Sequence, residues 1–477
     1  MKSKWVGAAI LTFYFCIQAE AQVSSMPTSA TPPSGQSSMT GASPFLGGVP
    51  SGKPAPGVMP LSLKDEIDRG LKYNLGLLLA EQGTREAHGA RVRALSELLP
   101  HLIWQTSETR EQLSLKAFGF TGFPGVPPIV GPFSVFDTRA FLSQPVIDFK
   151  AIHGARAESE NVKAAEYSYR DSRDLVILVC ADLYFAAIAG KSRVDAAGAE
   201  LKSAQAIYNK AADLKKAGVV PGIDVLRAQV ELEGQQQRLM FFQNAFEKQK
   251  LNLARAIGLP IGQQFLLADP IPYAPAQTVT LDEALEQARQ SRADFQSAVA
   301  LVRAAESNKR AAQGEGLPSL RFTADYGDIG LAPGDSHGTF TVAANLRVPI
   351  FQGGLVRGKV LEADALLQQR KAELEDLRSR IDYEVRTTFM DLKSTGAQVQ
   401  VAMSAEELAK EQLSQAQDRF AAGVANSLEV VQAQQALAAA DENYISSLFG
   451  FNVAKASLVR AMGKVEEAAK QFLGGRQ

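Results

Sequence analysis

The sequence predicts a mainly helical chain that is built from a duplicated unit, with short amphipathic strands between the helices. Three observations support this fold class. A turn at 217–226 recurs in similar form at 422–431, and each copy closes on a related Arg-Ala-x-Gly motif that ends at Gly258 or Gly463. A long stretch without proline leads into each turn, and an alternating apolar and polar segment precedes each stretch. Because internal repeats define the unit that folds, the duplication sets the frame for the other predictions.

Composition excludes several functions for a chain of 477 residues, of which 46% are hydrophobic. The formal net charge of −1 argues against a nucleic-acid partner, which usually needs a basic face. A phosphate-binding glycine loop and an HExxH pattern are both missing from the sequence. Cys180 follows an apolar run, which predicts a buried, inert thiol. We therefore expect no enzyme activity, cofactor or metal, and we expect surface or interface positions for the scattered histidines His88, His101, His153 and His337.

The first 21 residues have the pattern of a secretory signal, with Lys2 and Lys4 before an apolar stretch and Ala19-Glu20-Ala21 before the expected cleavage. Lipidation of Cys16 is the alternative, and the bulky residues that precede this cysteine argue against it. Residues 22–60 are rich in Pro, Ser, Gly and Thr, which predicts a flexible or surface-draped arm. Beyond the signal, we expect no apolar stretch long enough for a transmembrane helix.

From residue 61 onward the two halves run in parallel as a helix, two strands and two helices. The predicted first repeat spans 61–258, a connector spans 259–280, the second repeat spans 281–463 and a tail spans 464–477. The first helix of each repeat is expected over 63–98 and 281–315. The long helices are expected over 150–216 and 354–421. At 1.5 Å per residue each is roughly 100 Å long, which suits a tube or a coiled-coil stalk.

The last helix of each repeat carries a heptad pattern, which predicts knobs-into-holes packing against neighbouring helices. An ordinary helix-bundle core is the alternative explanation. The large residues of the pattern are Val225, Leu232, Leu239, Phe246 and Leu253 in the first copy, and Val430, Leu437, Tyr444, Phe451 and Leu458 in the second.

The strands are predicted at about 101–147 and about 318–349. In the second segment Leu320, Phe322, Ala324 and Tyr326 alternate with polar residues, which is the period and length of an outer-membrane strand. An amphipathic hairpin on a soluble core is the alternative. If the strands span a membrane, two hairpins are too few to close a barrel, and open strand edges are not tolerated in lipid. The chain must then contribute strands to a barrel that several copies share.

Three segments carry a resemblance to a known family. They are Leu-Pro-Ser-Leu at 317–320, Val-Pro-Ile-Phe-Gln-Gly-Gly at 348–354, and Arg-Phe-Ala-Ala-Gly at 419–423 with the helix start that follows it. In this order, and with the duplication intact, the chain resembles the TolC-type outer-membrane efflux proteins from about residue 61 to Gly463. The resemblance implies a homotrimer with a 12-stranded β-barrel in the outer membrane and a 12-helix α-barrel in the periplasm.

The implied role is a passive exit duct of a tripartite efflux or type I secretion system in a Gram-negative bacterium. It would dock to a periplasmic adaptor and an inner-membrane pump of the RND, ABC or MFS type, and outer-membrane lipid would surround its barrel. The cargo is not encoded in any motif. A soluble periplasmic or secreted helical stalk without channel activity is the alternative function.

The resemblance also implies a gate at the repeated turns. Asp224 matches the family's tip acid in the first repeat, and Glu429 matches a constriction acid in the second. Gln432 stands where the family commonly has another acid, so closure is expected to rest on apolar packing or on Arg227. Helix capping and the helix dipole are the alternative roles of the two acids. The expected adaptor-docking residues are Gly218, Val219, Arg419, Phe420, Gly423 and Val424.

Overall fold

The computed structural model describes residues 43–54, 56–119, 127–260, 262–269, 280–422, 424–425 and 427–465, which belong to the unit Ser43–Gln477. The expected signal at 1–21, most of the arm at 22–60 and the tail beyond residue 465 lie outside the described residues. Gly423, one of the expected docking residues, also lies outside them.

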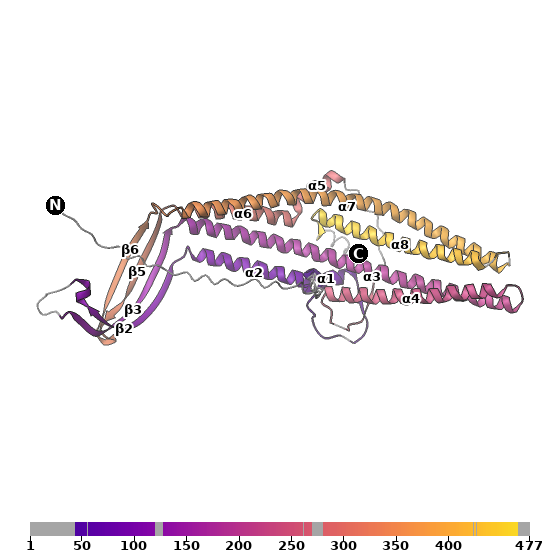
Figure 1. The fold of residues 1–477 in the computed structure, drawn as a ribbon, viewed down its shortest axis with the longest axis horizontal. Coiled ribbons are helices and arrows are strands. Elements are labelled where there is room, and N and C mark those ends of the chain that lie inside the picture. Colours follow the sequence, from indigo (N-terminus) through magenta and orange to yellow (C-terminus); the bar gives the residue numbers. More distant parts are fainter. Residues whose placement is uncertain are drawn as a thin grey trace, which may run out of the picture. The chain divides into compact units, whose positions relative to one another are not determined.

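Each half has the same element order (Figure 1). The first half comprises α1 (Leu63–Tyr73), α2 (Leu75–Ser96), β2 (His101–Ser114), β3 (Ile129–Ile147), α3 (Phe149–Lys216) and α4 (Gly222–Ala256). The second comprises α5 (Leu281–Ser291), α6 (Ala293–Gly314), β5 (Ser319–Gly330), β6 (Ser336–Arg347), α7 (Leu355–Ala421) and α8 (Ser427–Ala461). Two short strands, β1 (Met59–Leu61) and β4 (Phe265–Leu267), pair in parallel. Three 3₁₀ turns, Pro44–Leu46, Leu115–Phe118 and Pro333–Asp335, complete the described elements.

The first helix of each half is broken, so the prediction of one continuous helix over 63–98 and over 281–315 was wrong. Asn74 and Arg292 both adopt an extended backbone, with φ near −66°. The Asn74 amide donates to the carbonyl oxygens of Phe45 at 2.7 Å and Ala256 at 3.2 Å, and its side-chain oxygen accepts from the Gly76 N–H. These tertiary hydrogen bonds stabilise the break, and the local sequence does not reveal them.

The four long strands form one antiparallel sheet in the order β2-β3-β5-β6. The hairpin β5-β6 pairs Ser319 with Arg347 at one end and Gly330 with Ser336 at the other. The sheet meets the helices where β3 leads into α3 and β6 leads into α7 (Figure 1). Within the described chain β2 and β6 are the edge strands, and their outer backbone groups face no further strand.

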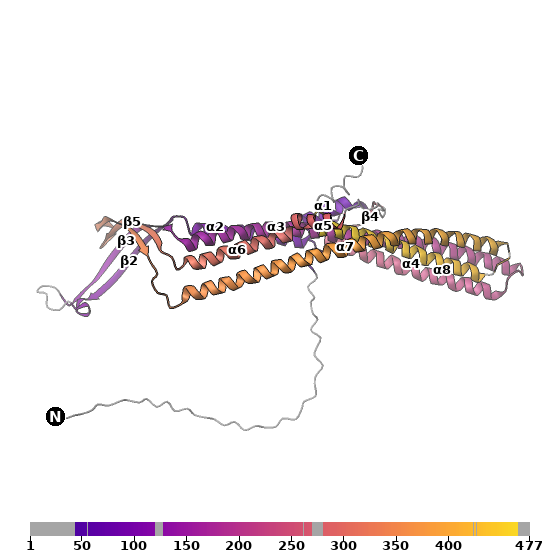
Figure 2. The same cartoon turned by 90° about the horizontal axis from the view of Figure 1, so that it is seen from above.

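The two long helices organise the helical layer (Figures 1 and 2). In the half next to the sheet, α3 packs against α2 and α6, and α6 packs against α7. In the half that carries the turns, α3 packs against α4 and α8, and α8 packs against α7. The layer order is therefore α2-α3-α6-α7 near the sheet and α4-α3-α8-α7 near the turns, with α7 at one edge throughout.

The main apolar cluster lies around the middle of α3. Val176, Cys180 and Tyr184 are almost completely buried there, together with residues of α1, α4 and both short strands. The same part of α3 contains an 18-residue window with a mean hydropathy of 1.7, so the expectation that no such stretch follows the signal was wrong. More than half of that window, 56%, is buried inside the chain. Its apolar residues belong to this intramolecular core, and burial raises the pKa of the Cys180 thiol.

The core also contains a carboxyl group, that of Glu66, which is fully buried and whose two oxygens have no hydrogen-bond partner among the described residues. Burial raises the pKa of Glu66 well above its ordinary value of 4.5. The folded state therefore retains this proton at a pH where the unfolded chain has lost it. Stability from this group is present at low pH and is lost as the pH rises from about 4.5 toward the folded-state pKa.

We predict that Glu66→Gln, which mimics the protonated acid, raises the melting temperature of the protein near neutral pH and leaves it nearly unchanged at about pH 4. Thermal melts across this pH range measure the effect. The control is Glu86→Gln at an exposed position on α2, which we expect to leave the pH profile unchanged. A Glu66→Gln variant that follows the parent's pH profile would contradict the prediction.

Candidate functional site

The sheet has one apolar face, and this face is exposed. The register places Trp104, Ala140, Tyr326 and Phe340 in one row across all four strands. The three aromatic side chains are 68%, 68% and 75% exposed. Next to this row, further apolar residues continue the face: Leu102, Leu142, Ala324, Val342, Phe322, Ala344, Leu320 and Leu346. An exposed apolar surface of this extent marks an interaction site rather than an ordinary protein surface.

The opposite face of the sheet is polar around Arg139, and in β2 and β3 it also carries the apolar pair Ile103 and Phe141. Arg139 donates to Asp137 at 2.7 Å and to Asp325 at 3.0 Å, so this guanidinium joins β3 to β5. Gly327 lies opposite Arg139, and a Cβ there would lie 2.2 Å from that of Arg139. The absence of a side chain at Gly327 thus makes room for the arginine. The predicted alternation of the strands is confirmed on both faces of the β5-β6 hairpin.

The turn between α3 and α4, residues 217–221, is the first tip. Gly218 adopts φ +77°, and the Val219 N–H donates to the Leu214 carbonyl at 2.9 Å, which ends α3. Asp224 lies in the first turn of α4 and is buried, and Arg227 on the same helix contacts its carboxylate at 3.4 Å. The N-cap residue is Pro221, so Asp224 occupies a helix-dipole position rather than the cap itself.

The turn between α7 and α8, residues 422–426, is the second tip. The Val424 N–H donates to the Arg419 carbonyl at 3.0 Å, which repeats the hydrogen bond of the first tip. Glu429 lies in the first turn of α8, and its carboxylate accepts from the Arg419 Nε atom at 3.0 Å. The arginine partner therefore lies across the turn here, whereas in the first tip it lies on the same helix. Gln432 is exposed on α8.

A shared apolar cluster joins the two tips. Ile207 of α3, Ala228 of α4, Phe420 of α7 and Val430 of α8 all belong to it. Phe420 is only 5% exposed, so its side chain is not available to a docking partner, which corrects that expectation. Val219 and Val424, in contrast, are exposed at 61% and 69%. The structure thus brings the two turns into one end of the helical layer and leaves a valine of each exposed.

Polar contacts between helices add links that the sequence did not reveal. Ser203 on α3 accepts a hydrogen bond from Gln417 of α7 at 3.3 Å and from Gln434 of α8 at 3.1 Å. Arg193 on α3 donates to Glu442 of α8 at 2.9 Å. These partners are more than 200 residues apart in sequence, and each is of a type common on exposed helix faces. A sequence pattern without pairing information carries no signal for them.

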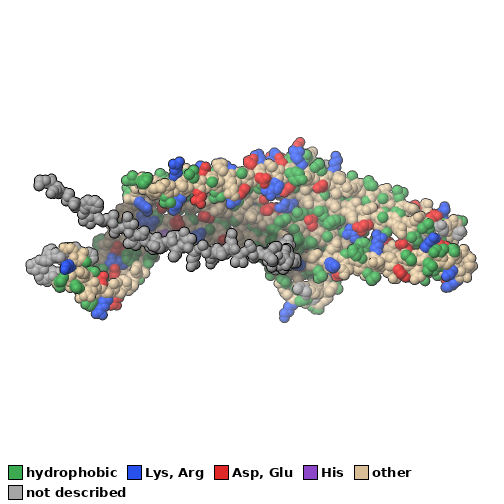
Figure 3. All heavy atoms as spheres, in the orientation of Figure 1, with side chains coloured by type: hydrophobic (Ala, Val, Ile, Leu, Met, Phe, Trp, Pro, Cys, Tyr) green, Lys and Arg blue, Asp and Glu red, His purple; other side chains and the backbone are tan. Residues whose placement is uncertain are grey.

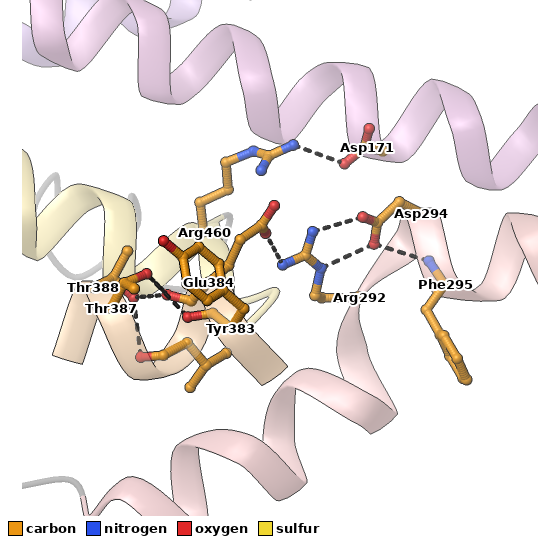
Figure 4. A network of polar contacts seen from close by, with 10 residues as sticks. Asp171, Arg292, Asp294, Phe295, Tyr383, Glu384, Thr387, Thr388 and Arg460 are labelled. Carbon is orange, nitrogen blue, oxygen red and sulfur yellow. Dashed lines mark hydrogen bonds and ion pairs between the residues drawn. The ribbon is translucent and has the colours of Figure 1, made fainter. Parts of the chain in front are cut away.

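A third polar network lies at the break between α5 and α6 (Figure 4). The Arg292 side chain is 5% exposed and donates to Asp294 and to Glu384 of α7, both at 2.6 Å. Nearby, Arg460 of α8 contacts Asp171 of α3 at 3.3 Å. Burial acts to lower the pKa of Arg292, and the hydrogen bonds to its two carboxylates raise it overall. This network ties four helices together where the helical layer changes its order.

The remaining polar surface offers no alternative centre. On the face in Figure 3, acidic and basic side chains are interspersed along the helices. Among the described residues, no group of three or more His, Cys, Asp or Glu side chains is placed to hold a metal ion. His88 lies at the surface of α2, where its Nε2 is 3.6 Å from the Glu166 carboxylate.

The sequence profile of the outer membrane efflux protein family matches residues 80–259 and 284–464. These two segments coincide with the two halves of the fold. Each runs from α2 or α5 to the end of the α4 or α8 region. The profile therefore covers most of the chain and contains the duplication.

Individual relatives are distant. A probable efflux pump outer membrane protein, TtgC of Pseudomonas putida, is 22% identical over 316 residues, or 64% of this chain and 63% of the relative's length. The pyoverdine export outer membrane protein OpmQ of Pseudomonas aeruginosa is 25% identical over 85% of this chain and 86% of its own. The CmeC outer membrane channel of Campylobacter jejuni has a similar fold, with a TM-score of 0.72 and 19% identity over 86% of this chain and 88% of its own.

We predict that Phe420→Ala loosens the tips. Removal of a fully buried phenylalanine side chain costs about 3–5 kcal/mol, and here the loss falls on the cluster that holds α3, α4, α7 and α8 together. Limited proteolysis should show faster cleavage within both turns, while the rest of the protein stays resistant. Val424→Ala, at an exposed position in the same turn, is the matched control and should leave the cleavage rate unchanged. Equal rates in the two variants would contradict the prediction.

Proposed function

The chain belongs to the outer membrane efflux protein family, and from this membership we propose that it is the outer-membrane exit duct of a tripartite efflux or type I secretion system. The family is one of outer-membrane channel proteins and not of enzymes, and the chain is accordingly an outer-membrane protein of a Gram-negative bacterium. We further propose that the duct is passive, with no catalytic step of its own. The soluble stalk is not favoured.

The observation that carries the proposal is the exposed apolar face of the four-stranded sheet, with its aromatic row Trp104, Tyr326 and Phe340. In outer-membrane strands one face contacts lipid, the opposite face lines a polar interior, and aromatic residues gather near the membrane boundary. Both faces of the β5-β6 hairpin fit that description, and Asp325 on its polar face belongs to the Arg139 cluster. A sheet that packed on a soluble core would bury its apolar face.

A homotrimer with one shared barrel is the assembly we propose. Three copies supply twelve antiparallel strands, and pairing of β6 with β2 of the next copy would satisfy the backbone groups at both edges. The two edge helices of the helical layer, α4 and α7, support the same closure, because each presents a stripe of exposed apolar residues. These are Ile223, Leu226, Val230 and Phe241 on α4, and Tyr383, Met390, Val401 and Leu408 on α7. The helices would then form the 12-helix periplasmic barrel.

In this assembly the two tips form the periplasmic mouth. We propose that Arg227, Glu429 and Gln432 line the constriction, with the buried Asp224 holding Arg227 in place, and that a periplasmic adaptor docks on Gly218, Val219, Arg419, Gly423 and Val424. The exposed Val219 and Val424 support an apolar component of this docking surface. An inner-membrane pump of the RND, ABC or MFS type would complete the system. The relative OpmQ, which is named a pyoverdine export outer membrane protein, is consistent with a role in export.

The lipid-facing assignment can be tested with two neighbouring residues on β6. We predict that Val342→Arg, on the apolar face, destabilises the barrel by up to about 2–4 kcal/mol, the cost of an arginine at the bilayer midplane, and abolishes trimer in the outer-membrane fraction. Thr341→Arg, on the polar face, should leave the trimer and its conductance in planar bilayers intact. Tolerance of both changes, or a water-soluble monomer without conductance from the parent chain, would contradict the proposed function.

The charge balance at the second tip gives a separate prediction. Because Arg419 neutralises Glu429 in each copy, Glu429→Gln leaves an uncompensated arginine at the proposed mouth. We expect reversal potentials in asymmetric salt to shift toward anion preference, and Arg419→Gln to shift them toward cation preference. Conductance should persist in both variants. Reversal potentials that do not move in either variant would place this pair outside the constriction.

A further inference from the structure

A polar cavity lies where the sheet meets the helices. It has a volume of about 380 Å³, and its walls include Asp148, Lys150, Glu315, Ser319, Arg347 and Gln352. Ser319 and Arg347 pair in register at the end of the β5-β6 hairpin, and they belong to the polar face of the sheet because Leu320 and Leu346 belong to the apolar one. Arg321, two residues along β5 from Ser319, lies on the same face. We call this region the junction site.

The carboxylates around the junction site already have partners. Asp148 accepts the Ala151 N–H at 3.0 Å and so caps α3. Glu315 contacts Lys359 at 2.6 Å and Lys150 at 3.3 Å. Asp325, the next acid along β5 on the polar face, is engaged by Arg139 at 3.0 Å. Glu315 and Asp325 are therefore neutralised by ion pairs, whereas the Asp148 carboxylate is held by a backbone N–H group and keeps its charge.

The two strand arginines lack such a counterion. Arg321 donates to the neutral hydroxyl of Ser143 at 3.1 Å. The Arg347 side chain is exposed and makes no hydrogen bond or ion pair within the described part of the chain. Two guanidinium groups thus stand at neighbouring rows of one sheet face, beside a cavity, and neither forms an ion pair among the described residues. Arginine keeps its charge at any physiological pH, so these two positive charges are permanent.

We infer that the junction site is an anion-selective ring, which attracts carboxylate, sulfonate or phosphate groups of the cargo as they pass from the helical tube into the strand barrel. This inference rests on the proposed function, since three copies are needed to place Arg321 and Arg347 around one lumen. Rings of arginine favour anions in membrane pores because the low-dielectric wall concentrates their field. Each guanidinium can also donate two parallel N–H hydrogen bonds to two oxygens of one such anion.

The tips do not offer a competing charge of comparable size. Their acids, Asp224 and Glu429, are each in contact with an arginine of the same copy. The two tip acids therefore leave little uncompensated negative charge at the mouth. Charge selection is thus placed at the sheet end of the helices, which is the end opposite the two turns (Figure 1).

The test measures the local potential with a thiol reporter in purified trimer. Asn345→Cys, in a Cys180→Ala background, places a thiol on the polar face opposite Arg321. This thiol is reacted with two methanethiosulfonate reagents, one with an anionic sulfonatoethyl group and one with a cationic trimethylammonioethyl group. Each rate is divided by the rate of the same reagent with a free small thiol, and the two normalised rates give an anionic-to-cationic ratio. We expect the anionic-to-cationic ratio to fall at least about threefold when Arg321→Gln and Arg347→Gln are combined. Arg321→Lys with Arg347→Lys should preserve it.

A second reporter separates local from general effects. Val424→Cys at the second tip should give the same ratio with and without the two arginines. An unchanged ratio at Asn345→Cys, in trimer that still conducts ions in planar bilayers, would overturn the anion ring. Failure of the proposed function has a different signature, namely the absence of trimer and conductance in the parent protein. The two outcomes are therefore distinguishable.

Discussion

The backbone groups along the outer edges of β2 and β6 impose the strongest constraint on this molecule. The sheet between them exposes an apolar face with a row of aromatic side chains, which suits contact with lipid and is unfavourable in water. In lipid, however, each unpaired backbone N–H and C=O group costs several kcal/mol. A four-stranded sheet can meet both conditions only when its edges pair with other copies. The proposed trimer and its helical barrel follow from that requirement.

The duplication supplies matching walls for such a barrel, but the two halves differ where they carry charge. The first tip pairs Asp224 with Arg227 along one helix, and the second pairs Glu429 with Arg419 across the turn. Both arrangements neutralise the acid. The uncompensated charge lies instead at the junction site, where neither Arg321 nor Arg347 forms an ion pair among the described residues. At the tips an apolar cluster packs the helices together and the acids are paired, whereas Arg321 and Arg347 at the junction site keep positive charges without an ion-pair partner among the described residues.

Local patterns predicted the elements well because each depends on neighbours in the chain. The absence of proline and the glycine at each turn predicted α3 and α7 to within about a residue of their observed ends. Period-two alternation predicted both faces of the β5-β6 hairpin. The breaks at Asn74 and Arg292 were missed, because the hydrogen bonds and ion pairs that stabilise them come from Phe45, Ala256 and Glu384. Phe420 was misplaced for a similar reason: an aromatic residue beside a turn gives no sign of which helices cover it.

The sequence by itself determined the family, the repeat, the order of helices and strands and the position of both tips. These features follow from local periodicity and from segments that recur at a fixed spacing. Only the tertiary structure decided which charges remain uncompensated. Whether an acid or an arginine is neutralised depends on atoms within about 4 Å, and those atoms come from distant parts of the chain, as with Arg139 and Asp325. The electrostatic character of the duct is therefore a property of the fold, although each of its charges can be read from the sequence.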